Sequence, residues 1–263
     1  MIYAKKSLGQ HFLKSEKALN TIVGSAEIEH GETVLEIGPG MGVLTERLLA
    51  SSCLVLAVEK DDNLYELLNQ KFDEEIKTEK LILIHDDILN FDPRSYNLEA
   101  SSYKLVANIP YNITGAILEK FLSAENQPES MVLLVQKEVA QRIVARDGKE
   151  SILSISVKAY GTPKYVETVL AGSFAPAPKV DSAIIKVETI SKDFFQNFSE
   201  KAFFQLLQAG FQSKRKKLSS NLSKIYPKEA VLNTFQKLNL DENVRAEDIG
   251  LEKWLKLGVF LLK

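Results

Sequence analysis

The sequence predicts an α/β fold, in which helices cover a mainly parallel sheet, followed by a smaller all-helical domain. Over the first two thirds of the chain, short runs of apolar and β-branched residues alternate with helical stretches, which is the pattern of a parallel sheet with helical crossovers. After Thr189 only helical spacing remains. We therefore assign residues 1–192 to a first domain and residues 193–263 to a helical second domain.

Seven segments are predicted to be strands. Most are short and nearly uninterrupted in their apolar character, as a sheet buried on both faces requires, and the last one alternates apolar with polar residues. In chain order the predicted strands are Thr33–Ile37, Leu54–Glu59, Leu81–His85, Lys104–Asn108, Met131–Gln136, Val166–Ala171 and Ser182–Thr189.

Helical spacing marks the segments between and after these strands. A leading helix is predicted at Glu16–Ala26, with Ser15 as its N-cap. The helices between the strands are predicted at Val43–Ala50, Asp62–Phe72, Ile113–Leu122 and Lys137–Ala145. Those of the second domain are predicted at Phe194–Phe211, Leu218–Ile225, Lys228–Leu238 and Leu251–Leu262, with Pro227 and Gly250 as breaks between them.

The composition narrows the function classes. Of 263 residues, 45% are hydrophobic and 26% are charged, which is ordinary globular usage. Cys53 is the single cysteine and the three histidines are scattered, so we expect neither a disulfide framework nor a metal site. No apolar run approaches the ~20 residues that span a bilayer, and no hydrophobic signal region follows the N-terminus. We expect a soluble, cytoplasmic protein that does not contact a membrane.

The charge is distributed unevenly along the chain. Residues 1–199 hold 21 Lys and Arg against 28 Asp and Glu, whereas residues 200–263 hold 12 against 7. The basic end contains the run Lys214, Arg215, Lys216 and Lys217. A basic module on an acidic body indicates a polyanionic partner, although a solvated helical face would give the same pattern.

A glycine-rich loop follows the first predicted strand. Glu36–Gly42 reads Glu-Ile-Gly-Pro-Gly-Met-Gly, and Gly38 and Gly40 would let the backbone approach a ligand closely. The dinucleotide fingerprint would need glycine at position 43, which is Val43. The loop therefore favours a nucleoside ligand without a diphosphate.

Acidic residues end the next two strands. Glu59 lies 21 positions after Gly38, where a carboxylate can accept both hydroxyls of a ribose. Asp87 follows the third strand, where it could accept a hydrogen bond from an adenine amino group, and Asp86 is a competing candidate. Because all of these positions lie at strand carboxyl ends, they are expected at the edge where open α/β sheets bind ligands.

The fourth strand ends in Asn108-Ile109-Pro110-Tyr111. The amino group of adenine is a poor nucleophile, because its lone pair is delocalised into the ring. Acceptors that bind its two N–H groups would activate it, and the Asn108 side chain and the Ile109 carbonyl can supply them. Pro110 would fix the turn, and Tyr111 would stack on a base that has left its helix. A strand-terminating turn with a packed tyrosine is the alternative interpretation.

The whole chain resembles the KsgA/RsmA-type ribosomal RNA adenine dimethyltransferases. The most specific matches are Gly9–Leu13, which reads Gly-Gln-His-Phe-Leu, and Phe174–Ser182, which contains Pro-Lys-Val-Asp-Ser. The other matching segments, in the family's order, are Glu36–Gly42, Glu59, Asp87, Asn108–Ile113 and Gln136–Val139.

This resemblance implies a Rossmann-like class I methyltransferase sheet with an antiparallel last strand and S-adenosylmethionine as methyl donor. It implies N6 dimethylation of two adjacent adenosines in the 3′-terminal hairpin loop of small-subunit rRNA. It also implies that Phe174 lies against the target base opposite Tyr111. The cofactor contacts would come from His11, Leu13, Gly38, Gly40, Glu59, Asp87 and Asn108. His11 stands where many relatives have Asn, which we regard as a mild change.

The same resemblance implies that the small ribosomal subunit is the substrate, and the clustering of the basic run indicates that it faces RNA. Lys214–Lys217 would contact RNA phosphates, with a contribution from Lys5, Lys6 and Lys14, and the enzyme is expected to act as a monomer. Three alternatives stay open: a large-subunit rRNA methyltransferase of the resistance type, a DNA adenine methyltransferase, and a non-catalytic RNA-binding paralogue. The lack of a large target-recognition domain disfavours the DNA enzyme.

Overall fold

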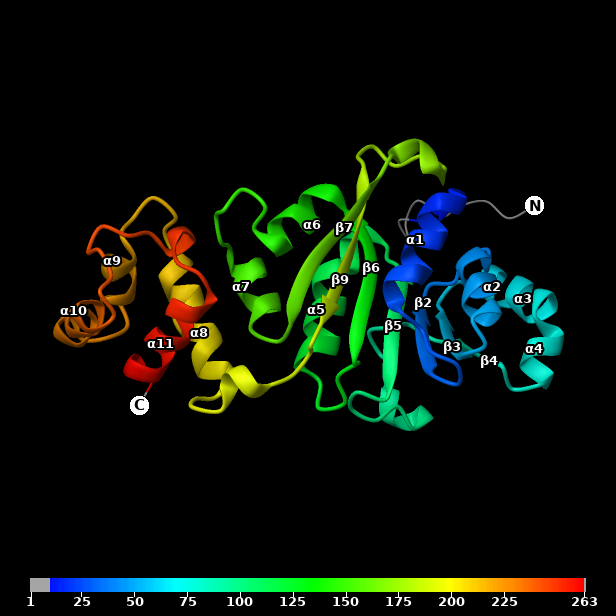
Figure 1. Cartoon of the computed structure of the whole chain (residues 1–263), viewed down its shortest axis with the longest axis horizontal. Coiled ribbons are helices and arrows are strands. Elements are labelled where there is room, and N and C mark those ends of the chain that lie inside the picture. Colours follow the sequence, from blue (N-terminus) through cyan, green and yellow to red (C-terminus); the bar gives the residue numbers. More distant parts are fainter. Residues whose placement is uncertain (1–9, 263) are drawn as a thin grey trace. The chain divides into compact units, whose positions relative to one another are not determined.

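The computed structural model describes residues 10–262, which form two compact units (Figure 1). The first unit comprises the chain up to Ala140 and the segment Thr162–Ile190, and the second comprises Gln141–Gly161 and the chain from Ser191 onward. The segment 141–161 thus groups with the C-terminal helices, whereas the sequence-based division placed it in the first domain. The division into domains at residues 1–192 and 193–263 stays a prediction.

The first unit contains a seven-stranded sheet with the strand order β4-β3-β2-β5-β6-β9-β7. The first five strands in this order, from β4 through β2 to β6, run parallel to one another. Strand β9 lies between β6 and β7 and is antiparallel to both. This confirms the predicted α/β class and the antiparallel last strand. The strands are β2 (Thr33–Ile37), β3 (Leu54–Glu59), β4 (Leu81–His85), β5 (Tyr103–Asn108), β6 (Ser130–Gln136), β7 (Thr162–Val169) and β9 (Ser182–Glu188).

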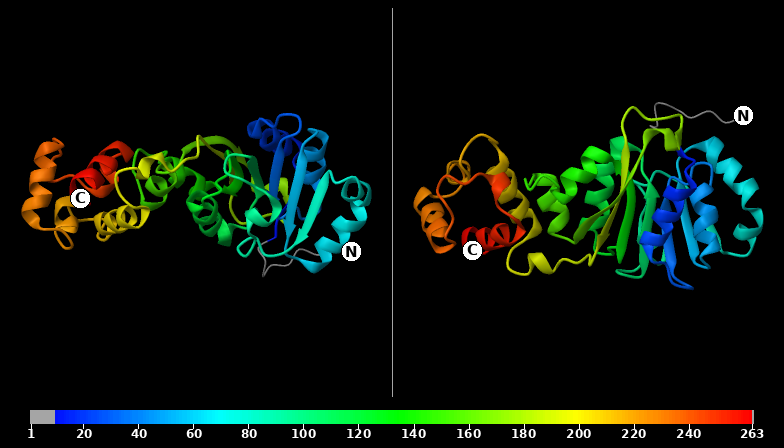
Figure 2. Two further views of the ribbon diagram at one scale, coloured as in Figure 1. Left: turned by 90° about the horizontal axis from the view of Figure 1, so that it is seen from below. Right: turned by 45° about the horizontal axis from the view of Figure 1, so that its top comes forward.

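Helices pack against this sheet and connect its strands (Figure 2). Ser15 caps the first of them by accepting a hydrogen bond from the Ala18 N–H, as predicted, and Asp61 caps the third. The helices that begin in this unit are α1 (Glu16–Ala26), α2 (Val43–Ala50), α3 (Asp62–Lys71), α4 (Asp73–Lys77), α5 (Thr114–Ser123) and α6 (Lys137–Val144). A short helix at α4 was not predicted.

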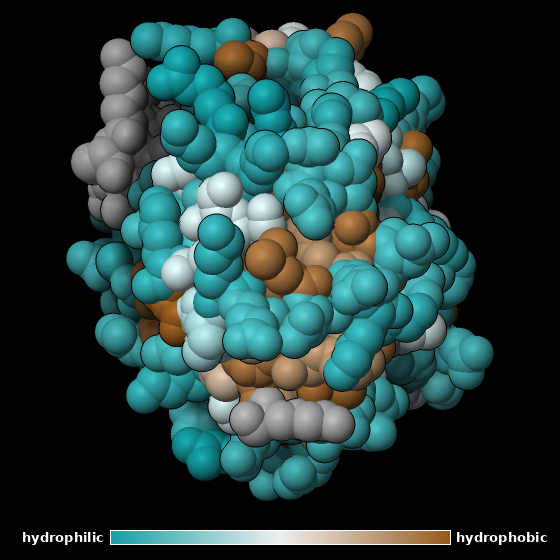
Figure 3. Space-filling view, turned by 90° about the vertical axis from the view of Figure 1, so that its left-hand side faces the viewer, coloured by the Kyte–Doolittle hydropathy of each residue, from teal (hydrophilic) through white to brown (hydrophobic). Residues whose placement is uncertain are grey.

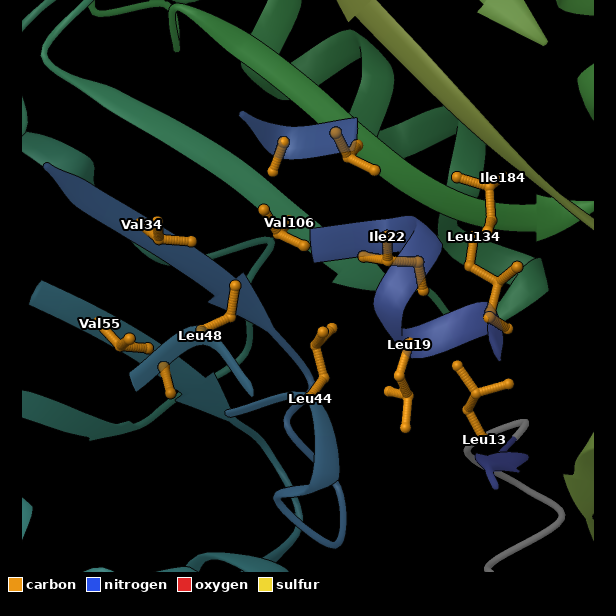
Figure 4. Close-up of a cluster of buried hydrophobic side chains, with 14 of the residues drawn as sticks. Leu13, Leu19, Ile22, Val34, Leu44, Leu48, Val55, Val106, Leu134 and Ile184 are labelled. Atoms are coloured by element: carbon orange, nitrogen blue, oxygen red, sulfur yellow. The ribbon is translucent and has the colours of Figure 1, made fainter. Parts of the chain in front are cut away.

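The core on one face of the sheet lies beneath α1 and α2 (Figure 4). Leu19 and Ile22 of α1 and Leu44 and Leu48 of α2 are buried against strand residues such as Val106. The strand residues that alternate with this set are buried as well, namely Leu35, Leu56, Leu105 and Leu133. Burial on both faces explains why these strands are almost wholly apolar in sequence.

Strand order places a crevice at one edge of the sheet. Strands β2 and β5 are neighbours, yet the chain proceeds from β2 outward through β3 and β4 before it returns to β5. The loops that leave the carboxyl ends of β2 and β5 therefore diverge, which creates the crevice in which open α/β sheets bind ligands.

The second unit is a helical bundle with its own core. Its helices are α7 (Ile152–Lys158), α8 (Glu200–Phe211), α9 (Leu218–Leu222), α10 (Lys228–Lys237) and α11 (Leu251–Leu261). They bury Trp254, Phe203 and Phe235 in a shared cluster. The predicted helix 194–211 begins instead at Glu200, because Ser199 caps it and a 3-10 turn occupies Asp193–Phe195. Hydrophilic side chains cover most of the face seen in Figure 3.

Candidate active site

A cavity of about 320 Å³ opens at the carboxyl ends of the central strands of the first unit. Its walls come from the loops after β2, β3, β4 and β5 and from the segment that precedes α1. The predicted site residues among those that line it are His11, Leu13, Gly38, Gly40, Glu59, Asp87, Asn108, Ile109, Pro110 and Tyr111. The structure thus brings together residues that are up to a hundred positions apart.

The loop after β2 needs glycine for different physical reasons at different positions. Gly38, Gly40 and Gly42 all have positive φ, at 64°, 60° and 74°. A Cβ at Gly42 would lie 2.6 Å from the Phe72 ring, so that position is needed for packing. A Cβ at Gly38 would meet no described atom within 4 Å, and the space beside it belongs to the cavity.

Glu59 holds the glycine loop and the start of α3 together. Its Oε2 accepts a hydrogen bond from the Gly40 N–H at 3.1 Å, and its Oε1 accepts one from the Asp61 N–H at 2.8 Å. Burial raises the pKa of Glu59, and these N–H donors oppose the rise. Since each carboxylate oxygen has two lone pairs, both can accept a further hydroxyl from a ligand.

Asp87 is already partnered. Its Oδ2 lies 2.7 Å from Lys60 Nζ, and its Oδ1 accepts a hydrogen bond from the Leu89 N–H at 3.0 Å. The Lys60 ammonium holds the pKa of Asp87 below its usual range. Asp86 also lines the cavity, and its Oδ1 accepts from the Asp87 N–H at 2.7 Å. Both acids stay candidates, and the sequence had not indicated the pairing with Lys60.

The turn after β5 presents two oxygen acceptors. The Asn108 Nδ2 donates to the His11 carbonyl at 3.1 Å, which assigns the amide orientation and leaves Oδ1 as the acceptor. Neither Asn108 Oδ1 nor the Ile109 carbonyl accepts a hydrogen bond from any residue between 10 and 262. Two unengaged acceptors on successive residues can bind the two N–H groups of one amine.

Two contacts hold the Tyr111 side chain, one at the face of its ring and one at its hydroxyl. Its ring stacks on His11, with centroids 5.8 Å apart and planes 24° apart, and its hydroxyl lies 2.7 Å from Ser182 Oγ. His11 Nδ1 lies in turn 2.8 Å from the Pro176 carbonyl oxygen. The two most specific sequence motifs therefore meet beside the turn after β5.

A two-stranded sheet joins these motifs. Strand β1 (Phe12–Leu13) pairs antiparallel with β8 (Phe174–Ala175), and Leu13 lies opposite Phe174. Both side chains point into the hydrophobic core, and Phe174 is 3% exposed and does not line the cavity. Contact of Phe174 with a target base stays a prediction that this burial disfavours. Gly9, Lys5 and Lys6 lie outside the described residues.

Glu36 is a candidate that the sequence analysis did not single out. It lies in β2, is 1% exposed and lines the cavity, and neither of its carboxylate oxygens has a hydrogen-bond partner among the described residues. Burial raises the pKa of Glu36 to about 8; the nearby Thr45 hydroxyl, which is also without a hydrogen-bond partner among the described residues, opposes the rise, and the Glu59 charge adds to it. An unpartnered buried carboxylate would be stabilised by a cationic ligand, because the cation would offset the cost of burying the charge. The sequence did contain a signal for this residue, because Glu36 is an acid within a predicted buried strand that is mainly apolar.

The basic run forms a loop between α8 and α9 in the second unit. All four of its cations are exposed, and none pairs with an acid in the described part of the chain. Asn221, which is 1% exposed, donates to the carbonyls of Gly210 and Ser213 at 2.7 and 3.1 Å and so fixes the start of the loop. The cations are Lys214, Arg215, Lys216 and Lys217.

Neither a metal cluster nor a membrane span is evident within residues 10–262. No group of three or more His, Cys, Asp or Glu side chains is placed to hold an ion. No helix there combines the length and the apolar character needed to cross a bilayer.

Comparison with known proteins identifies the family. Residues 1–262 match the family model described as ribosomal RNA adenine dimethylase. The chain is 44% identical over 97% of its length to a ribosomal RNA small subunit methyltransferase A from Dehalococcoides mccartyi, of which the match covers 87%. It is 39% identical to the protein of that name from a Nostoc species, with 99% of each chain covered.

Two solved structures agree with this match. A dimethyladenosine transferase from Plasmodium falciparum superimposes with a TM-score of 0.80 at 28% identity, covering 94% of this chain and 96% of that one. The 23S rRNA methyltransferase ErmE superimposes with a TM-score of 0.77 at 26% identity, covering 95% and 99%. The chain belongs to the ribosomal RNA adenine dimethylase family.

Proposed function

We propose that this protein transfers methyl groups from S-adenosylmethionine to the N6 amines of two adjacent adenosines in the 3′-terminal hairpin loop of small-subunit rRNA. The observation that carries the proposal is the pair of unengaged acceptors, Asn108 Oδ1 and the Ile109 carbonyl, beside a cavity that can hold a nucleoside.

The cavity fits a cationic nucleoside donor. The unpartnered Glu36 carboxylate would face the positive charge, and the open space beside Gly38 would admit the ligand against the backbone. Glu59 would accept ribose hydroxyls, Asp87 or Asp86 would accept from the adenine amino group, and His11, Leu13 and Gly40 would complete the walls. S-adenosylmethionine would supply an electrophilic methyl group on a sulfonium.

The residues of the turn would orient the acceptor amine. With Asn108 Oδ1 and the Ile109 carbonyl each binding one N–H, the nitrogen lone pair would point away from both acceptors and into the cavity. Pro110, with φ of −56°, keeps the turn rigid. Tyr111 would stack on the extruded base. Catalysis would come mainly from this orientation. A strong general base is not required, because the methylated amine carries the positive charge after transfer and can then lose its proton to solvent.

The small subunit is the preferred substrate because the curated relatives reported above are small-subunit enzymes at 39–44% identity. Likeness to ErmE, a 23S rRNA enzyme, makes the large subunit the second candidate. Lys214–Lys217 would bind RNA phosphates, and we expect a monomer that acts in the cytoplasm.

Labelled donor and purified substrates test the proposal. Unmodified small subunits, large subunits and double-stranded DNA would be incubated separately with the protein and methyl-labelled donor, with the Asn108→Ala variant as a control. We expect label in the small subunit alone, at two adjacent adenosines. Label in the large subunit would support the ErmE-like alternative, and no label in any substrate would contradict methyl transfer.

A further inference from the structure

Ser182 makes the polar contact that fixes the outer end of Tyr111. Its Oγ lies 2.7 Å from the Tyr111 hydroxyl, and the contact joins residues 71 positions apart. Ser182 is 0% exposed, and Oγ contacts no other polar group between residues 10 and 262. Among the described residues, the Ser182 hydroxyl therefore makes its polar contact with Tyr111 alone.

The backbone that carries Ser182 is fixed from both sides. Ser182 begins β9 and lies opposite Gln136 of β6 and Val169 of β7. The preceding residue, Asp181, accepts a hydrogen bond at its carbonyl from the Lys137 N–H and another at its Oδ1 from the Ala171 N–H. Because this backbone is held on both sides, the Ser182 hydroxyl is a fixed anchor for the end of the Tyr111 side chain and favours one direction of that side chain.

The position and the plane of the ring both matter, because a stacked base lies over the ring beneath it and parallel to it. The Tyr111 side chain can rotate about two bonds: the first swings the whole ring, and the second turns the ring about the axis that ends at its hydroxyl. The Ser182 contact restricts the first rotation because it holds the hydroxyl in place, and the stacked His11 ring restricts the second. Burial also raises the pKa of Tyr111, and the contact with Ser182 opposes the rise.

We propose that Ser182 is a positioning residue for base methylation, which acts by holding the Tyr111 ring in the position required to stack on the target adenine. This rests on the proposed function, because it assumes that Tyr111 contacts the base. It also assigns a role to the last residue of the Pro-Lys-Val-Asp-Ser motif.

A double-mutant cycle tests the proposal, since Ser182→Ala and Tyr111→Phe remove the same hydrogen bond from opposite ends. We expect Ser182→Ala to lower kcat on small subunits about three- to tenfold, the loss typical of one hydrogen bond. Affinity for S-adenosylhomocysteine should change less than twofold. In the Tyr111→Phe background, Ser182→Ala should add less than a twofold further loss.

A second readout follows the ring without catalysis. In protein carrying ¹³C-labelled tyrosine, the Tyr111 signal is assigned by its loss in Tyr111→Phe, and we expect it to shift in Ser182→Ala. Ser154→Ala is the matched control: Ser154 is also 0% exposed, but its hydroxyl accepts from the Ser151 N–H and donates to the Ser151 carbonyl in the second unit. It should lower thermal stability without moving the Tyr111 signal.

The outcomes separate this inference from the proposed function. An undiminished Ser182→Ala effect in the Tyr111→Phe background, or an unmoved Tyr111 signal, would overturn the positioning role while wild-type methylation persists. If the wild-type protein methylates neither subunit, the proposed function fails, whatever the tyrosine signal does.

Discussion

The cavity of the first unit and the basic loop of the second are built in opposite ways. Around the cavity most polar side chains are engaged by neighbours, as Glu59 is by two N–H groups and Asp87 by Lys60. In the basic loop the four cations are exposed and unpaired within the described chain. Chemistry at the cavity should therefore depend on side-chain geometry, and binding through the loop should depend on charge and salt.

The largest effect should come from the cavity. Asn108→Ala removes one of the two acceptors for the amine, and we expect methyl transfer to fall at least ~10²-fold, the typical loss for one preorganised polar group. Donor binding, measured by calorimetry, should fall much less. Asn197→Ala, at an exposed position of the second unit, is the matched control. Near-normal turnover in Asn108→Ala would contradict activation by this turn.

Removing the loop's charge should give the next largest effect. With Lys214–Lys217 all changed to alanine, subunit affinity should fall about 10- to 100-fold, and the slope of log affinity against log salt should decrease by about three, because each lost phosphate contact contributes nearly one. Filter binding at several salt concentrations measures both.

The control for the loop variant replaces four other exposed lysines: Lys77, Lys80, Lys201 and Lys228. It should change the salt slope much less, and donor affinity should be unaltered in both variants. If the two fourfold variants had equal slopes of log affinity against log salt, the basic loop would not be part of the RNA interface.

Glu36 should link donor affinity to pH. Its pKa of about 8 in the ligand-free protein means that it is largely protonated at pH 6.5, and a cationic donor favours the ionised form. Donor affinity should therefore rise as pH increases to about 8. Glu36→Gln should abolish this rise and weaken binding about tenfold at pH 8.5. Exposed Glu66→Gln is the control, and a retained pH dependence in Glu36→Gln would contradict the assignment.

The same shift affects stability with a defined sign. Because the folded pKa of Glu36 lies above its ordinary value of 4.5, the folded protein holds a proton that the unfolded chain releases between pH 4.5 and 8. Its contribution to the free energy of unfolding should fall as pH rises through that window. Urea titrations across this pH window measure the effect. The free energy of unfolding should fall more for the wild type than for Glu36→Gln.

The smallest expected effect concerns the two acids after β4, Asp86 and Asp87, and shows which of them contacts the adenine of the donor. We expect Asp87→Asn to weaken donor binding several-fold and Asp86→Asn less than twofold, because Lys60 and the Leu89 N–H hold the Asp87 carboxylate in place. Calorimetry with S-adenosylhomocysteine would measure both. The reverse order would assign the adenine contact to Asp86.

Strands and long helices were predictable because burial leaves a continuous apolar pattern. Strands β2, β3 and β4 have the predicted bounds, as do α1 and α2. Two-residue strands such as β1 and β8 carry no periodicity, and their pairing joins segments about 160 positions apart. Helix α7 was missed although Ser151 and Ser154 form a capping box at its start.

The site was predictable where a residue ends a strand, as Glu59 and Asn108 do. Which partners those side chains acquire depends on tertiary contacts, so the Lys60–Asp87 pair and the His11 contact to Asn108 were not foreseen. Phe174 shows the same dependence: the resemblance implies a contact with the base, which stays a prediction, and nothing in the sequence indicated that strand pairing would bury this side chain in the core.

The most direct test of amine activation by Asn108 and Ile109 is a structure of the protein bound to the small ribosomal subunit with S-adenosylhomocysteine. We expect an adenine turned out of the 3′-terminal hairpin, with its N6 within hydrogen-bond distance of both Asn108 Oδ1 and the Ile109 carbonyl. An adenine held elsewhere, or an Asn108 side chain turned away from the base, would contradict it.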